Sequence, residues 1–94
     1  RMADIRVERR HSAGKEAAMA AALRVAERLK DKAQVNYRVN GDAIEIERSG
    51  AKWRIVVSDD RVLAEVTLGL MLKPMRGMIE GKIDEYFARY LDVK

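Results

Sequence analysis

Four short segments of alternating apolar and polar side chains make up VNYRVNGDAIEIERSGAKWRIVVSDDRVLAEVTL, residues 35–68. Alternation with a period of two is the pattern of a strand that buries one face. The first two segments are separated by Asn40-Gly41, which is typical of a type I′ hairpin turn, where both central residues need positive φ. Further turn signals follow at 49–50 and 58–60. The stretch therefore predicts an antiparallel four-stranded meander with one apolar face.

The segments on either side of the meander predict one more strand and two helices. Residues 4–9 alternate in the same way, so they form a strand at a sheet edge or beside the last meander strand. Residues 13–32 contain no Pro and carry an apolar stripe at helical spacing, with Ser12 as the expected N-cap. Pro74 suits the first position of a final helix. The apolar side of that helix is formed by Leu72, Met75, Ile79, Ile83, Tyr86 and Tyr90.

The order of these elements is β-α-β-β-β-β-α. Because the sheet and both helices have one apolar side each, we predict an α+β two-layer sandwich. In this fold a five-stranded, mainly antiparallel sheet carries both helices on one face. The 94 residues are expected to form a single domain, 1–94. Arg1 precedes Met2, so Met2 is the expected native start.

The composition excludes several kinds of chemistry. The chain has no Cys, which excludes disulfides, thiol catalysis and Cys-ligated metals, and its single His makes a metal site unexpected. The net charge is +4 and opposite charges alternate, so no nucleic-acid partner is expected. No run approaches the roughly 18 apolar residues of a transmembrane segment, and the expected location is cytoplasmic. We predict no cofactor and no catalytic residues, and hence no enzyme.

Basic residues before the first helix form a candidate anion site. Arg9, Arg10, Ser12 and Lys15 surround the expected helix N-terminus, whose free N–H groups attract anions. The simpler account is a capped helix with solvated arginines, because the segment lacks the spaced glycines of a phosphate loop. For the acidic residues of the meander, cross-strand ion pairs are likewise simpler than paired-carboxylate catalysis.

The start of the final helix has more apolar and basic side chains than one buried stripe needs. Cations in a first helical turn oppose the helix dipole, and Met side chains adapt to irregular partners. Two glycines on the outer side suit the close approach of a second chain, so a homodimer is one hypothesis. In the simpler account, Leu70 and Met71 fill the corner between sheet and helix, and the glycines are merely tolerated. The candidate interaction surface comprises Leu70, Met71, Lys73, Arg76, Gly77, Met78 and Gly81.

A second hypothesis places a small acyl or hydroxyacyl ligand between the sheet and the final helix. A sheet that grips a long C-terminal helix is the layout of larger lipid-transfer folds, although fold alone does not imply function. The cavity would be lined by Tyr37, Trp53, Met75, Ile79 and Tyr86.

Several motifs along the chain resemble the small polyhydroxyalkanoic acid system proteins, also called the polyhydroxyalkanoate granule-region family. The motifs are IRVERRHS at 5–12 with Gly14, GD at 41–42, ERSG at 47–50, DD at 59–60 and LGLMLKP at 68–74, with Gly77 and Ile79-Glu80 in register. Members of this family are linked by genomic setting to bacterial storage-polyester synthesis or its regulation. The family has no established catalytic residues to transfer.

The resemblance implies a setting rather than a reaction. We therefore expect a non-enzymatic accessory protein of storage-polyester metabolism. Its partner would be the polyester granule or a granule-associated protein, contacted through the surface at the start of the final helix. The alternative remains the acyl or hydroxyacyl carrier.

Overall fold

The computed structural model of the chain describes residues 3–33 and 35–91, so the expected start at Arg1 and Met2 lies outside the described residues. The elements are β1 (Ile5–Arg10), α1 (Lys15–Ala33), β2 (Asn36–Asn40), β3 (Ala43–Arg48), β4 (Ala51–Val57), β5 (Arg61–Leu68), a 3-10 turn η1 (Lys73–Met75) and α2 (Arg76–Leu91). The predicted order β-α-β-β-β-β-α is therefore confirmed, with the 3-10 turn as an addition.

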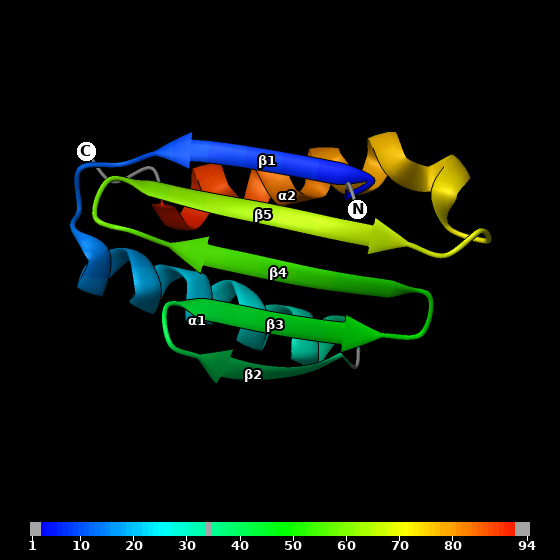
Figure 1. Cartoon of the computed structure of the whole chain (residues 1–94), viewed down its shortest axis with the longest axis horizontal. Coiled ribbons are helices and arrows are strands. Elements are labelled where there is room, and N and C mark those ends of the chain that lie inside the picture. The colour runs from blue at the N-terminus through cyan, green and yellow to red at the C-terminus, as the bar shows by residue number, and fades with distance from the viewer. Residues whose placement is uncertain (1–2, 34, 92–94) are drawn as a thin grey trace.

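The five strands form one antiparallel sheet in the order β1-β5-β4-β3-β2. Both helices lie behind this sheet in Figure 1, with α1 across β2, β3 and β4 and α2 along β1. The predicted two-layer α+β fold is confirmed. The first strand satisfies both positions that the sequence left open, because β1 is at an edge and also pairs with β5, the last meander strand.

A tight turn follows the hairpin signal, but its two central residues are Gly41 and Asp42 rather than the predicted Asn40 and Gly41, because Asn40 still belongs to β2. Asn40 pairs with Ala43 across β2 and β3, which leaves two residues in the loop, and Gly41 has a φ of +63°. Glycine adopts this left-handed conformation without the steric penalty that a Cβ brings. This turn sets the register of the first hairpin and thereby the face on which each side chain of β2 and β3 lies.

The hydrophobic core lies between the sheet and the helices. In the cross-strand register, Ile5 is opposite Val66, Val66 is opposite Trp53 and Trp53 is opposite Ile46, so these side chains share the helix-facing side. The helices add Ala18, Ala22, Val25, Ala26 and Leu29 from α1, and Ile83 and Phe87 from α2. Burial of this apolar surface is the main stabilising contribution to the fold.

The start of α1 differs from the prediction. The helix begins at Lys15, and the carbonyl of Gly14 accepts the first helical hydrogen bond from Ala18 N at 3.0 Å. Gly14, with a φ of +87°, therefore occupies the capping position that was predicted for Ser12. The reason is a short connection at 11–14, in which His11 Nδ1 accepts a hydrogen bond from Ala13 N at 3.2 Å. This connection moves the first helical turn beyond the reach of the Ser12 hydroxyl.

The apolar side of α2 is also shifted. Phe87, which the predicted stripe omitted, is 2% exposed, whereas Met75 is 40% exposed. Met75 belongs to the 3-10 turn, where successive side chains are about 120° apart rather than about 100°, so the stripe does not extrapolate back to it. The buried side of α2 begins at the partly buried Ile79 and continues through Ile83 to Phe87.

Candidate functional site

Large apolar side chains are exposed at the start of α2 and in the segment before it. Leu70 is 83% exposed, Met71 is 89% exposed and Met78 is 57% exposed, and the half-exposed Met75 lies between them in sequence. We call these four residues the apolar tip. Among residues 3–32 and 35–90, for which the structure describes the exposure, only Val39 on β2 is another exposed large hydrophobic residue. Such a local concentration on a small fold marks a contact surface more often than scattered single residues do.

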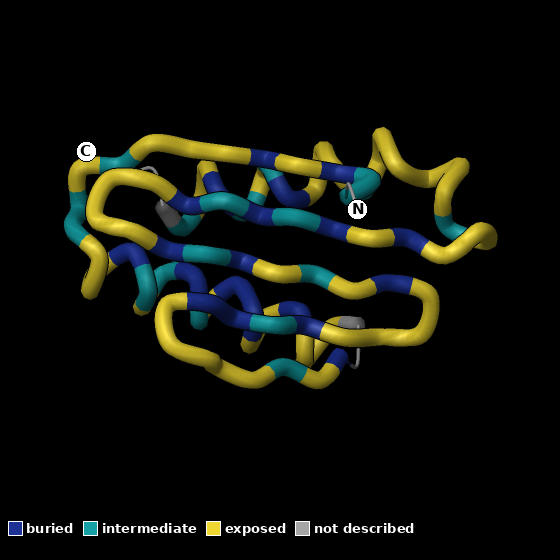
Figure 2. The backbone as a smooth tube through the Cα atoms, viewed as in Figure 1, coloured by how far each residue is buried: buried dark blue, intermediate teal, exposed yellow. Residues whose placement is uncertain are grey.

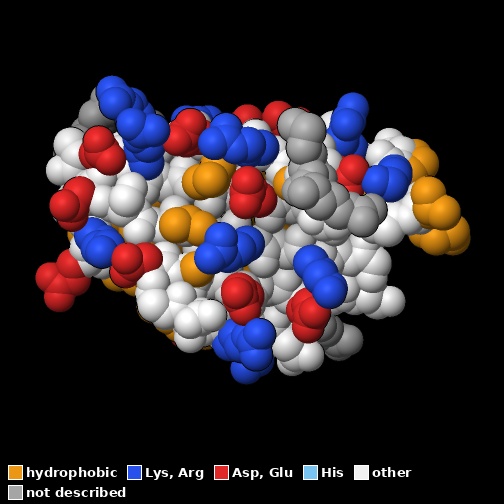
Figure 3. Space-filling model, viewed as in Figure 1, with side chains coloured by type: hydrophobic (Ala, Val, Ile, Leu, Met, Phe, Trp, Pro, Cys, Tyr) orange, Lys and Arg blue, Asp and Glu red, His pale blue; other side chains and the backbone are white. Residues whose placement is uncertain are grey.

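The apolar tip lies at one extremity of an elongated molecule whose principal extents are 36 × 25 × 22 Å. In Figure 1 the segment between β5 and α2 projects beyond the end of the sheet at the right, and Figure 2 shows this segment almost entirely exposed. Hydrophobic side chains gather at the same right-hand end in Figure 3. The first turns of α2 therefore have no sheet beneath them to cover their apolar side chains.

Leu72 fills the corner beneath the apolar tip. A Cβ added at Gly50 would come within 3.2 Å of Leu72 Cδ1, so the leucine side chain lies directly against the β3–β4 turn. Gly69 N donates to Gly50 O at 2.8 Å, and Gly69 O accepts from Leu72 N at 3.0 Å. The simpler account of Leu70 and Met71 as corner-filling residues is therefore wrong, because Leu72 already occupies that corner.

Asp4, which precedes β1, anchors the segment between β5 and α2. Its Oδ2 accepts a hydrogen bond from Leu68 N at 2.7 Å, and its Oδ1 is 2.8 Å from Lys73 Nζ. The Leu68 amide, and after it the Lys73 ammonium, hold the pKa of the Asp4 carboxyl below its ordinary value. The sequence analysis missed Asp4 because its partners lie 64 and 69 residues away.

Basic side chains border the apolar tip. Lys73 and Arg76 are both exposed, and no ion pair of Arg76 is found within the described part of the chain. Arg48, at the end of β3, lines the same shallow hollow as Gly69, which precedes the tip. We call Arg48, Lys73 and Arg76 the basic rim. Arg48 was not predicted, because its place beside the tip follows from the pairing of β3, β4 and β5.

Gly77 and Gly81 are on the open side of α2. A Cβ added at either glycine would meet no atom within 4 Å, and neither residue has the positive φ that favours glycine. The monomer therefore contains no internal contact that requires glycine at these positions. The structure leaves this face available to a second chain, and the homodimer stays a prediction.

The four residues of the predicted anion site do not converge on one point. Arg9 donates to Asp84 of α2 at 2.9 Å, and Lys15 Nζ is 2.9 Å from Asp42 Oδ2, which raises the Lys15 pKa. Arg10 is opposite Arg61 in the β1–β5 register, and Ser12 is exposed in the connection before α1. Arg9 and Lys15 are therefore directed at carboxylates in different parts of the chain rather than at a common ligand position.

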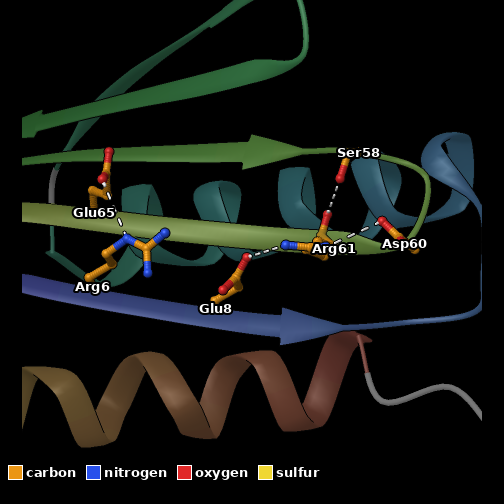
Figure 4. A network of polar contacts seen from close by, with 6 residues as sticks. All are labelled: Arg6, Glu8, Ser58, Asp60, Arg61 and Glu65. Atoms are coloured by element: carbon orange, nitrogen blue, oxygen red, sulfur yellow. Dashed lines mark hydrogen bonds and ion pairs between the residues drawn. The ribbon is translucent and has the colours of Figure 1, made fainter.

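The sheet face opposite the helices carries charges of both signs (Figure 3). Arg6 pairs with Glu65 at 3.9 Å and Arg61 with Glu8 at 3.2 Å, both across β1 and β5 (Figure 4). Further along the sheet, Arg38 donates to Glu45 at 3.0 Å. Glu45, Glu47 and Glu65 thus take part in cross-strand ion pairs, as the simpler account predicted, whereas Asp60 is 3.9 Å from its chain neighbour Arg61.

The five residues of the predicted ligand cavity are distributed over different parts of the molecule. Tyr37 donates to Glu27 of α1 at 3.4 Å. Tyr37 and Trp53 contribute to a hollow of about 530 Å³ together with the charged row of the outer sheet face, including Arg38, Glu45, Arg54 and Glu65. Met75, Ile79 and Tyr86 are not among the residues that line it. The geometry therefore does not gather this set around one ligand.

The comparison with known protein families agrees with the motifs described above. In residues 3–33 and 35–91, no helix is long and apolar enough to cross a membrane. No curated protein and no solved structure is significantly similar to the chain. A family model described as "Putative polyhydroxyalkanoic acid system protein" matches residues 5–91, which include the whole sheet, both helices and the apolar tip. The chain therefore belongs to the polyhydroxyalkanoic acid system protein family.

Proposed function

We propose that the protein is a non-enzymatic accessory component of storage-polyester metabolism in the cytoplasm. In this proposal it attaches to the polyester granule surface through the apolar tip. The observation that carries the proposal is the exposure of Leu70 and Met71, at 83% and 89%, on a segment that is fixed at its base. Membership in a family named for the polyhydroxyalkanoic acid system supports the granule as the place of attachment.

The fixed base favours attachment because the apolar side chains need little further ordering on contact. Asp4 holds both Leu68 and Lys73, and Leu72 packs on Gly50. A surface that is already ordered loses less conformational entropy when it binds. Attachment by this end also leaves the charged outer face of the sheet accessible to other components.

Co-sedimentation with isolated storage granules tests the proposal. Leu70→Ser/Met71→Ser removes the two most exposed apolar side chains without a change of charge, and we expect at least about a tenfold loss of granule binding. Both side chains are almost fully exposed, so the variant should retain the wild-type thermal unfolding midpoint.

Val39→Ser is the matched control. Val39 is 50% exposed and apolar, but it lies on β2, away from the tip. Its substitution should leave granule binding unchanged. Equal binding by wild type and Leu70→Ser/Met71→Ser, or no granule binding by the wild type, would contradict the proposal.

A further inference from the structure

We infer that the partner of the apolar tip is an interface that carries anionic lipid headgroups. This inference rests on the proposed function and specifies the chemistry of the same site. Leu70 and Met71 insert among acyl chains, while Arg48, Lys73 and Arg76 lie at the level of the headgroups. Apolar insertion bordered by basic side chains is the general arrangement of proteins that bind in a membrane interface.

The positions of Lys73 and Arg76 favour an anionic partner over a purely apolar one. Lys73 and Arg76 lie at the N-terminal end of α2, where the helix dipole disfavours positive charge. Asp4 forms an ion pair with Lys73 at 2.8 Å and its charge also acts on Arg76 at longer range, but in the described part of the chain Arg76 has no direct ion pair. An external anion beside Arg76 would supply the missing compensation. A bare polyester or hydrocarbon surface carries no formal charge and would not.

The balance of charges around the apolar tip also favours an anionic partner. The basic rim contributes three positive charges against the one carboxylate of Asp4 that contacts it. Glu47, which also borders the hollow beside Arg48, is 3.8 Å from Lys52 and is thereby balanced by its own cation. The end of the molecule that bears the apolar tip therefore presents a net positive charge to its partner.

Because the apolar tip is small, the cations should add substantially to its affinity for an anionic interface. Two inserted side chains give only weak attachment, in the same way that a single acyl chain gives marginal and reversible membrane binding. Each basic residue near an anionic surface contributes about a fivefold gain in affinity. Binding is therefore expected to be reversible and to depend strongly on salt.

Vesicle co-sedimentation tests the inference directly. One set of vesicles contains phosphatidylcholine alone, and the other contains equal parts of phosphatidylcholine and phosphatidylglycerol. The full chain should bind the mixed vesicles more tightly, and about 1 M salt, which shortens the Debye length to about 3 Å, should remove the difference. Leu70→Ser/Met71→Ser should reduce binding to both kinds of vesicle.

Single-charge variants separate the basic rim from the net charge of the chain. Arg76→Gln should lose about fivefold in affinity for the mixed vesicles and nothing for phosphatidylcholine alone. Arg10→Gln, which removes an exposed cation at the far end of β1, should behave like the wild type on both. Equal losses for the two variants, or equal binding to both vesicle types, would overturn the inference.

The granule experiment distinguishes this inference from the proposed function. Granule binding that requires Leu70 and Met71, without binding to either vesicle, would refute the lipid interface and leave the proposed function intact. That result would assign the apolar tip to a protein or to the polyester itself. Failure to bind both granules and vesicles would refute both.

Discussion

The two helices have similar positions in the fold but use their apolar residues differently. Along α1 the buried side runs from Ala18 to Leu29, so the apolar stripe is covered through most of the helix. In α2 the fully buried residues are Ile83 and Phe87, while Met78 near its start and Met75 in the preceding 3-10 turn are exposed. The first helix is therefore a core element throughout, and the second is a core element only in its later turns.

The difference arises from where each helix lies relative to the sheet. α1 crosses β2, β3 and β4, and its small Ala side chains allow the helix to approach these strands closely. α2 lies along the edge strand β1 and begins beyond the end of the sheet (Figure 1). An apolar residue without a strand beneath it stays exposed, which indicates where to look for a contact surface.

The largest effect is expected in the core half of α2. Phe87→Ala should lower the free energy of unfolding by about 3–5 kcal/mol, because it removes a buried ring and leaves a cavity. Met78→Ala, on the same helix, should change this free energy by less than about 0.5 kcal/mol. Urea unfolding measures both values. Similar losses for the two variants would mean that Met78 is also part of the core.

A smaller loss is expected where α1 packs most closely. Ala22 is 0% exposed, so Ala22→Leu should destabilise the protein by about 1–3 kcal/mol through overpacking of the core. Ala20→Leu is the matched control, because Ala20 is exposed on the same helix and the propensity change is identical. Unchanged stability of Ala22→Leu in urea unfolding would show that the core has space for a larger side chain at this position.

A gain in stability is expected on the open side of α2. Gly81→Ala should stabilise the monomer by about 1 kcal/mol, because a Cβ meets no atom there and alanine favours the helix. Gly77→Ala should give a smaller gain, since Gly77 lies in the first turn. If a second chain packs on this face, the added Cβ would instead weaken the dimer. Native mass measured alongside thermal unfolding separates the two cases.

The smallest effect is expected at the anchor of the apolar tip. The pKa of Asp4 is lowered in the folded protein, so its contribution to stability is present at neutral pH and is lost as the pH falls below its ordinary value of 3.8. Asp4→Asn should remove this part of the acid dependence, as measured by thermal unfolding at a series of pH values. Lys73→Gln should retain most of it, because the Leu68 amide is the larger cause. Parallel curves for wild type and Asp4→Asn would contradict the assignment.

Much of the fold could be predicted because its signals are local. Alternation along residues 35–68, together with the hairpin signal at Asn40-Gly41, was sufficient for the meander. The candidate surface was recognised from an excess of apolar and basic residues around Met71 and Lys73. The first residues of the two helices were harder to predict, because Gly14 delays the start of α1 and the 3-10 turn at Lys73–Met75 delays the start of α2 by a few residues.

The sequence by itself determined the element order, the apolar face of the sheet and the absence of cysteine chemistry, because each depends on composition or on neighbours within a few residues. Tertiary structure alone decided which apolar residues stay exposed. Leu72 is partly buried and Leu70 is exposed, because the sheet ends at Leu68 and the chain then turns so that Leu72, and not Leu70, packs against Gly50. The anchor at Asp4 likewise exists only once β1 has paired with β5, because this pairing brings Asp4 beside Leu68 at the end of β5.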